Sequence, residues 1–387
     1  MTHPVGRHRF LLRRTVALGL VAAAIAATVL ALRGHDSEAT ADQGLAAAPA
    51  RVATTLSDGL TPHQLAGQRV IAGFSGRSVP AGLRRAIRAG RIGGVILFAD
   101  NLGSRRQIRG LTRGLQRIPR PAGLRRRPLL VTVDQEGGLV KRLSGAPRYS
   151  AAQMGARGPR FSRRQGRLTG RNLRNAGINV DLAPVLDVAR RGGNIDVTGR
   201  GFGRTAGRVG KTAVAFARGL EATGVAATAK HFPGLGAASL NTDDAVQRIE
   251  LPRSTLRRVD LAPYRPFIRA GGELVMVGTA IYPAFGEKPA AFNRRVVTGE
   301  LRGRLGFRGV TITDALEATA ARAFGGSKRA AVAGARAGMD LLLYGDWREA
   351  LEGETAIARK LRAERLDRGE FRDAVDRILS LRRRLDG

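Results

Sequence analysis

Gly224-Val-Ala-Ala-Thr-Ala229 leads directly into Lys230-His-Phe-Pro-Gly-Leu-Gly236 near the middle of the chain. The first stretch is short, apolar and preceded by a turn residue, which is typical of a strand that is buried on both faces. The second stretch therefore brings a cation, an imidazole and a loop rich in Pro and Gly to the end of a strand. Two carboxylates, Asp243 and Asp244, follow a few residues later. Packing has little use for this combination, so it indicates a site that binds a polyol and acts on it.

The same kind of short, apolar run recurs along the chain, and amphipathic segments rich in Arg separate the runs. The sequence predicts strands at residues 70–74, 94–98, 129–133, 178–182, 225–229, 274–277, 310–313 and 341–344. It predicts helices at 104–115, 163–176, 209–223, 257–270, 298–305 and 328–337, and further helices within 347–385. Eight β/α repeats in roughly 320 residues are typical of a (β/α)₈ barrel rather than an open doubly wound sheet. We therefore predict an α/β protein with a single TIM-type barrel.

The first 60 residues have a different character. Residues 1–14 are basic, residues 15–32 are apolar or small, and residues 33–60 lack periodicity and predict a flexible linker. An apolar stretch of roughly 18 residues is about long enough to cross a bilayer, and the basic residues before it orient the amino terminus inward. We expect a transmembrane anchor, and a signal peptide cleaved near Ala39-Thr-Ala41 is the alternative. In either case residues 61–387, the predicted barrel domain, work outside the cytoplasm.

The net charge of +35 raises the question of a nucleic-acid partner. The cations are almost all Arg, and they are spread through helix-like segments such as 83–91 instead of gathering with aromatic residues in one stripe. We therefore expect a solvated basic surface and no specific nucleic acid, and binding of anionic polymers is kept as a rival function. The chain has no Cys, which excludes disulfides, thiolate metal sites and a thiol nucleophile.

Polar residues cluster where the predicted strands end, and in a barrel the carboxyl ends of the strands form the active site. The residues at these ends and in the loops after them are Asp134, Arg142, Asp181, Asp187, Arg200, Lys230, His231 and Asp314. A structural role is the alternative for each of them, because a carboxylate can cap a loop or helix, an Arg can form a surface ion pair and a His can be hydrogen-bonded in the core. We assign Asp181 and Asp187 to that structural class and the others to a site.

Four of these segments together resemble a known family. They are Asp134-Gln-Glu-Gly-Gly138 with Arg142, Gly177-Ile-Asn-Val-Asp-Leu-Ala-Pro184, Lys230-His-Phe-Pro-Gly-Leu-Gly236 and Gly306-Phe-Arg-Gly-Val-Thr-Ile-Thr-Asp314. In order and spacing they resemble the N-terminal barrel domain of glycoside hydrolase family 3, and most of all its single-domain bacterial β-N-acetylhexosaminidases. The resemblance runs from about Thr61 to the end of the chain.

The resemblance implies roles for individual residues. Asp314 matches the aspartate nucleophile of the family, and the residues that match its sugar-binding positions are Asp134, Arg142, Arg200, Lys230 and His231. The chemistry is consistent, because carboxylates and cations can grip adjacent sugar hydroxyls in bidentate fashion. A retaining glycosidase also needs a carboxylate that forms a glycosyl ester and an acid that protonates the leaving oxygen.

The acid is where this chain departs from the family pattern. The hexosaminidases it resembles carry Asp-x-His on the loop after the Lys-His motif, with the His as acid/base. This chain has Asn241-Thr242-Asp243 at that place. Asp243, with help from Asp244, is then the candidate acid/base, provided that burial or the charge of Asp314 raises its pKa. The alternative is that turnover is impaired.

The sequence thus predicts a membrane-anchored, extracytoplasmic glycosidase that hydrolyses β-linked N-acetylglucosaminides or related cell-wall glycans with retention. Two alternatives stay open, namely a tethered glycan-binding protein with little turnover and a β-glucosidase or xylosidase of the same family. We expect no cofactor, and the sequence shows no His, Asp and Glu spacing typical of a metal site.

Overall fold

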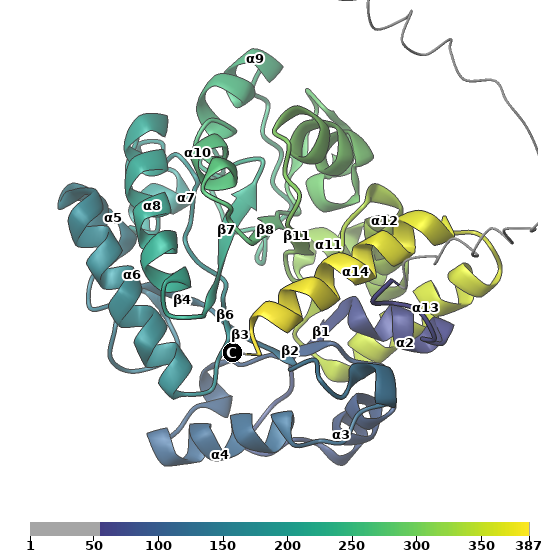
Figure 1. Ribbon diagram of the computed structural model, residues 1–387. Helices are drawn as coiled ribbons and strands as arrows, with labels where there is room; N and C mark the ends of the chain where they lie inside the picture. Colours follow the sequence, from purple (N-terminus) through teal and green to yellow (C-terminus); the bar gives the residue numbers. More distant parts are fainter. Residues whose placement is uncertain (1–54, 387) are drawn as a thin grey trace, which may run out of the picture. The chain divides into compact units, whose positions relative to one another are not determined.

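A computed structural model of the protein describes residues 55–386. Eight parallel strands form its central sheet, in the spatial order β11-β8-β7-β6-β3-β2-β1-β12. Their bounds are Val70–Ala72 (β1), Gly94–Ile96 (β2), Leu130–Val133 (β3), Val180–Asp181 (β6), Ala226–Phe232 (β7), Leu274–Val277 (β8), Val310–Thr313 (β11) and Leu342–Tyr344 (β12). A further parallel bridge between Ile312 and Leu341 joins the two ends of this order. The sheet is therefore a barrel in which strand neighbours follow the chain, and the predicted α/β barrel is confirmed (Figure 1).

Two short antiparallel pairs lie outside the barrel sheet. One joins β4 (Gln135–Gly137) to β5 (Val140–Lys141) directly after β3, and the other joins β9 (Ile281–Tyr282) to β10 (Gly286–Pro289) after β8. Both pairs begin within a few residues of the carboxyl end of a barrel strand. They therefore extend the edge of the barrel at which the polar motifs collect.

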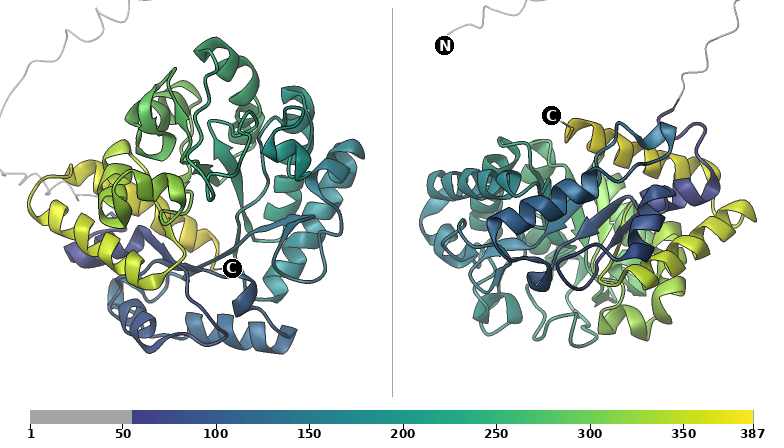
Figure 2. Two further views of the ribbon diagram at one scale, coloured as in Figure 1. Left: turned by 180° about the vertical axis from the view of Figure 1, so that it is seen from behind. Right: turned by 90° about the horizontal axis from the view of Figure 1, so that it is seen from below.

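Helices surround the strands, as Figure 2 shows from two further sides. The α-helices are Pro62–Gln68 (α2), Ala81–Arg88 (α3), Arg105–Gln116 (α4), Ala151–Ala156 (α5), Gly158–Asn175 (α6), Asn194–Val197 (α7), Ala206–Glu221 (α8), Arg253–Thr255 (α9), Tyr264–Arg269 (α10), Thr319–Ala323 (α11), Gly326–Ala337 (α12), Trp347–Arg362 (α13) and Arg368–Arg384 (α14). Short 3₁₀ segments are Ala99–Asn101 (η1), Ala122–Leu124 (η2) and Ala290–Phe292 (η4), and π-helical segments are Leu256–Asp260 (η3) and Arg295–Arg304 (η5).

Side chains alternate between two cores along each strand. On β1, Ile71 belongs to the core inside the barrel, whereas Val70 and Ala72 pack against the helices outside. The same alternation places Ile96 and Leu130 inside the barrel. All of these side chains are buried, so each strand is covered on both faces and its apolar run is continuous.

The amino-terminal end of the barrel is closed by α14. Its Ile378 and Leu381 join the inner core, and the guanidinium of the fully buried Arg382 donates hydrogen bonds to the carbonyl oxygens of Arg127 and Pro128, at 2.7 Å each. This end is therefore filled with side chains, and the carboxyl end is the one left for a site.

Glycines allow α6 and α8 to approach each other closely. A Cβ atom on Gly166 would lie 2.0 Å from the carbonyl oxygen of Phe216, and one on Gly219 would lie 2.1 Å from that of Arg163. Any larger residue at either position would collide with the backbone of the other helix, so the close packing of α6 against α8 requires glycine at both positions.

The structure corrects the predicted helix at 257–270. The segment is divided into the short elements η3 and α10, and Pro263 lies between them. Proline lacks an N–H and cannot continue a regular helix from the preceding turn, which accounts for the break. The predicted helix at 298–305 is present as part of the π-helical η5.

The prediction for β7 also needs correction. The strand was expected to end at Ala229, but it continues to Phe232, so that Lys230 and His231 lie inside it. The extension is held from both sides, by a parallel bridge from Val185 to Lys230 and by the pairing of Phe232 with Val277.

The folded domain begins before Thr61. Ser57 and Leu60 are buried, and Asp58 forms an ion pair with Arg372 of α14 at 2.8 Å. Residues 55–60, which we expected to end the linker, thus pack against the barrel. The predicted anchor at 15–32 and most of the linker lie outside the described residues. Within residues 55–386 no helix is both long enough and apolar enough to cross a bilayer.

Candidate active site

A cavity of about 170 Å³ opens at the carboxyl ends of the barrel strands. Its walls include the seven residues that the sequence singled out, namely Asp134, Arg142, Arg200, Lys230, His231, Asp243 and Asp314. They come from the ends of β3, β7 and β11, from the β4–β5 pair and from two long loops. The sequence prediction that these distant residues meet at one rim is confirmed, whereas their individual roles remain predictions.

Four charged side chains alternate in sign along one wall of the cavity, and we call them the charged cluster: Asp134, Lys230, Glu136 and Arg200. The Lys230 ammonium lies 2.6 Å from a carboxylate oxygen of Asp134 and 2.7 Å from one of Glu136. Arg200 donates two hydrogen bonds of 2.8 Å to Glu136, one to each oxygen. Two cations thus balance two carboxylates, which is the arrangement that makes burial of charge tolerable.

Mutual attraction keeps Glu136 and Lys230 of this cluster ionised. Burial opposes the charged form of Glu136, but the charges of Lys230 and Arg200 hold the pKa of its carboxyl well below the usual range. Burial likewise disfavours the ammonium of Lys230, yet its carboxylate neighbours hold the pKa of Lys230 above the usual value. Glu136 and Lys230 therefore stay charged over the whole physiological pH range.

Arg142 adds a cation whose side chain has no carboxylate within ion-pair distance in residues 55–386. Its backbone N–H donates to the side-chain oxygen of Gln135 at 3.0 Å, and the Gln135 amide in turn donates to the carbonyl oxygens of Leu143 and Ala146 at 2.9 Å each. The buried Nε of Arg142 has no hydrogen-bond partner among the described residues. Gln135 thus fixes the position of Arg142, and the guanidinium is left to meet a ligand.

His231 is held by Asp187, which is fully buried. One oxygen of Asp187 accepts the backbone N–H groups of His231 (3.1 Å) and Leu235 (2.7 Å), and the other lies 2.8 Å from Nδ1 of His231. The carboxylate therefore favours the proton on Nδ1 and leaves Nε2 for the cavity. Our assignment of Asp187 to a structural role agrees with these contacts, because it acts through His231.

Asp314 follows β11 directly and is half-buried at the cavity wall. Its backbone N–H continues the strand ladder to the carbonyl oxygen of Val277 at 3.0 Å. One carboxylate oxygen accepts the N–H of Ala315 at 2.9 Å, and no partner is recorded for the other within the described part of the chain. The carboxylate is therefore held in place with one oxygen available.

Asp243 reaches the cavity from the loop after β7. The Asn241 side chain donates to it at 3.0 Å, and its own carbonyl oxygen accepts the N–H of Thr319 at 3.3 Å. Asp243 is an exposed residue overall, but the atoms around its carboxyl desolvate that group partly, and this desolvation together with the charge of Asp314 raises its pKa. Asp244, the next residue, is exposed and does not line the cavity.

Two more carboxyl groups near the cavity have raised pKa values. Burial raises the pKa of Asp181 to about 8, against the opposing effect of the Gln135 N–H that it accepts at 3.0 Å. Burial also raises the pKa of Glu317 to about 7, and this residue lines the cavity three positions after Asp314. Asp181 does not line the cavity, and as a largely neutral acid it holds the backbone at Gln135, between Asp134 and Glu136 of the charged cluster.

Sequence reasoning missed Glu136 and Glu317 as residues of the site. Glu136 stands inside the quoted Asp134-Gln-Glu-Gly-Gly138 motif, and its place next to a barrel strand end was the available signal. Glu317 gives no such signal, because its position depends on Gly345, which directly follows the carboxyl end of β12. A Cβ atom on Gly345 would lie 2.1 Å from a carboxyl oxygen of Glu317, so only glycine leaves room for this side chain.

The described residues contain no group of three or more His, Cys, Asp or Glu side chains that could hold a metal ion. The cavity itself combines carboxyl groups, two of which (Asp243 and Glu317) have raised pKa values, with a polar wall of ion-paired side chains. A carboxylate nucleophile, a carboxylic acid and fixed hydroxyl-binding charges are the components that displacement at an acetal carbon needs.

Comparison with known sequences points the same way. Residues 67–381 match the glycosyl hydrolase family 3 N terminal domain. A protein of Arthroderma benhamiae called an uncharacterized secreted glycosyl hydrolase is 38% identical over 330 residues, which cover 83% of this chain and 93% of that protein. A beta-hexosaminidase of Stenotrophomonas maltophilia is 33% identical over 285 residues, which cover 71% of this chain and 82% of that protein.

Among solved structures, a glycoside hydrolase family 3 beta-N-acetylglucosaminidase from Paenibacillus sp. superposes with a TM-score of 0.80. It is 34% identical in sequence, and the match covers 85% of this chain and 64% of that one. The present chain therefore spans somewhat less than two thirds of that longer protein.

Proposed function

This chain is a glycosidase that belongs to glycosyl hydrolase family 3, and we propose that it hydrolyses β-linked N-acetylglucosaminides of cell-wall glycans with retention, through an ester on Asp314. One observation carries the proposal. Asp314, Asp243 and the charged cluster line one cavity at the carboxyl ends of the barrel strands. The beta-hexosaminidase and beta-N-acetylglucosaminidase names of the relatives support the choice of sugar.

In the first step, the free oxygen of Asp314 attacks the anomeric carbon of the sugar. The bond from that carbon to the leaving oxygen breaks, and Asp243 gives its proton to the leaving oxygen. The raised pKa of Asp243 supports this role, since a general acid must be protonated near the working pH. The product is a glycosyl ester on Asp314, with the leaving alcohol released.

In the second step, Asp243 takes a proton from a water molecule that attacks the same carbon, and the ester bond to Asp314 breaks. Two displacements at one carbon restore the starting configuration, so the sugar is released with retention. Asn241 assists in both steps by holding the carboxyl of Asp243 through its amide at 3.0 Å.

The charged cluster and its neighbours hold the sugar during both steps. Asp134 and Lys230 present an acceptor and a donor side by side, which suits a pair of adjacent hydroxyls. Arg142 and the Nε2 of His231 supply further polar contacts in the same cavity. Because the cluster is fixed by its internal ion pairs, it binds without a large ordering cost.

We further propose that the enzyme works outside the cytoplasm, tethered by residues 15–32. The apolar character of that segment supports the tether, and the word "secreted" in the name of the Arthroderma relative supports the compartment. Separation of membrane and soluble fractions, with the 1–32 deletion as the comparison, tests the tether. Equal amounts of the full chain and the deletion variant in the soluble fraction would contradict it.

The activity is tested with a chromogenic β-N-acetylglucosaminide. Wild type should release the chromophore and give the β-anomer first, as followed by proton NMR, and Asp314→Ala should lose at least about a thousandfold in kcat. A 5-fluoro glycoside should leave one sugar on the peptide that contains Asp314, as located by mass spectrometry. Glycan binding without turnover in wild type would instead favour the glycan-binding alternative, and a preference for β-glucosides would shift the assignment of the sugar.

A further inference from the structure

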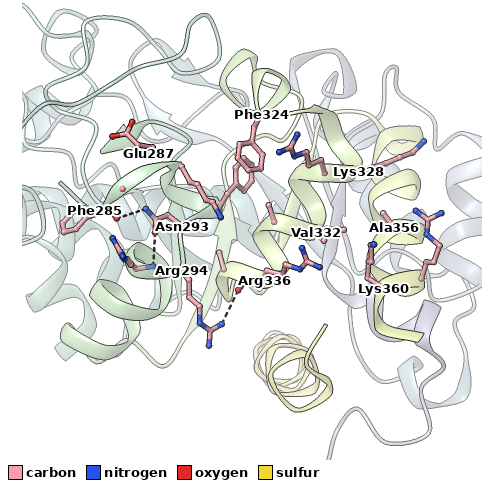
Figure 3. A pocket seen from close by; sticks show the side chains of 18 residues that line it. Phe285, Glu287, Asn293, Arg294, Phe324, Lys328, Val332, Arg336, Ala356 and Lys360 are labelled. Carbon is pink, nitrogen blue, oxygen red and sulfur yellow. Dashed lines mark hydrogen bonds between the residues drawn. The ribbon is translucent and has the colours of Figure 1, made fainter. Parts of the chain in front are cut away.

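A second cavity, of about 910 Å³, lies alongside α12 (Figure 3). It shares no lining residue with the candidate active site. The β9–β10 pair, the start of η5, α12 and α13 contribute its walls. Eight of its eighteen lining residues are Lys or Arg, and Glu287 is its one acid. Lys and Arg make up 66 of the 387 residues of the chain, against 31 Asp and Glu, so the cavity is enriched in cations beyond the basic average of the protein.

Local carboxylates neutralise only two of these cations. Arg294 pairs with Glu370, and Lys328 lies 3.4 Å from Glu352. The acid of the lining, Glu287, is itself engaged by Arg248 at 2.8 Å. Six lining cations have no carboxylate within ion-pair distance among the described residues: Lys288, Arg295, Arg329, Arg336, Arg359 and Lys360. They face one hollow, so their fields add there and attract anions.

The floor of the cavity is apolar. The rings of Phe292 and Phe324 pack with their centroids 4.7 Å apart, and the guanidinium of Arg329 lies over the Phe324 ring at 5.3 Å. Phe292 is buried and Phe324 is half-buried, so these rings are already in contact with protein. They are therefore not a free stacking platform of the kind that single-stranded nucleic acids require.

We propose that this cavity, which we call the basic cavity, binds an anionic cell-wall polymer, a chain of phosphodiester-linked polyols or of uronic acids. Figure 3 shows the unpaired cations Arg336 of α12 and Lys360 of α13 on separate segments around the hollow, an arrangement that can follow a chain of repeated charges. A flexible polyanion without bases fits unpaired cations over an apolar floor, because it needs charge neutralisation and no stacking. Bound in this way, the polymer holds the enzyme at the wall and leaves the candidate active site free.

The test compares two triple variants that remove the same charge. Arg336→Gln, Arg359→Gln and Lys360→Gln together alter the basic cavity. Arg160→Gln, Arg167→Gln and Arg171→Gln together alter α6, which lies across the barrel from α12 in Figure 1. All three α6 residues are exposed. Binding of fluorescent polyglycerol phosphate and polygalacturonate is measured by anisotropy over a range of salt concentrations, with neutral dextran and a single-stranded DNA of equal length as comparisons.

We expect wild type to bind one or both polyanions and not dextran, and the cavity variant to bind at least about tenfold more weakly. The slope of the logarithm of its binding constant against the logarithm of the salt concentration should also become smaller in magnitude by about 2. Each lost contact with a single-stranded polyanion lowers that slope by about 0.7, and three cations are removed. The α6 variant should bind as wild type does. Hydrolysis of a small chromogenic glycoside should be the same in all three proteins, which separates this proposal from that for the active site.

Three results would overturn the inference. Equal weakening in both triple variants would mean that binding reports only the overall charge. Absence of binding to either polyanion at low salt would leave the basic cavity without the proposed ligand. Tighter binding of DNA than of both polymers, lost in the cavity variant, would assign the cavity to nucleic acid.

Discussion

Replacing Asp243 by asparagine removes the proposed proton donor and changes the side-chain volume very little. Asn241 still has a partner at position 243, because an amide oxygen can accept its hydrogen bond in place of the carboxylate. Asp244→Asn is the matched control, since it makes the same change one residue away on an exposed side chain that does not line the cavity. Any difference between the two variants therefore reports the position of the carboxyl group and not the loss of one charge.

The size of the effect depends on the leaving group. General acid catalysis typically contributes 10²–10⁴-fold, and water at the partly open mouth of the cavity can replace part of it. We expect Asp243→Asn to lose about a hundred- to a thousandfold in kcat/KM, about 3–4 kcal/mol, on a glycan with a sugar leaving group. On a dinitrophenyl glycoside, whose leaving group needs no proton, the first step should change less than about tenfold.

Kinetics with both substrates, with and without azide, test whether Asp243 is the general acid and base. Azide attacks the glycosyl ester without a general base, so it should restore turnover of the dinitrophenyl glycoside by Asp243→Asn and yield the β-glycosyl azide. The alkaline limb of the wild-type pH profile, set by the raised pKa of Asp243, should disappear in this variant. Equal losses on both substrates, or the same behaviour in Asp243→Asn and Asp244→Asn, would refute the assignment.

Three further changes have expected outcomes. Lys230→Met breaks buried pairs of 2.6 and 2.7 Å and should cost about 3 kcal/mol in urea unfolding, whereas Lys211→Met on the surface should stay within about 0.5 kcal/mol. Asp187→Asn replaces the carboxylate at Nδ1 of His231 with an uncharged amide, which no longer fixes the position of the imidazole proton. The value of kcat/KM should therefore fall about ten- to a hundredfold in steady-state assays, while circular dichroism should show that the fold persists. Burial and a neighbouring carboxylate raise the pKa of Glu221 to about 8, so its ionisation costs stability progressively as pH rises from about 4.5 to about 8. Glu221→Gln should therefore unfold at a higher urea concentration than wild type at pH 8, with little difference at pH 4.5.

The strands were predictable because each is covered on both faces, and a continuous apolar run such as Leu274–Val277 is the direct consequence of that burial. The convergence of the site residues was predictable for the same reason, since strand ends in a barrel meet at one edge. The extension of β7 through His231 was not, because it depends on pairing with Val185 and Val277, and a single segment does not contain that information. Only the structure could show the support of His231 by Asp187 and the position of Glu136 between two cations.

The protonation state of Asp243 follows from its surroundings. Desolvation raises the pKa of Asp243, and the charge of Asp314 in the same cavity adds to this rise. When Asp314 becomes an ester its charge disappears, and that contribution to the pKa of Asp243 disappears with it. Asp243 is then easier to ionise, which suits a base, whereas beforehand it is easier to protonate, which suits an acid. One carboxyl group can thus serve both steps without a histidine, because the nucleophile it faces carries a charge in one step and none in the next.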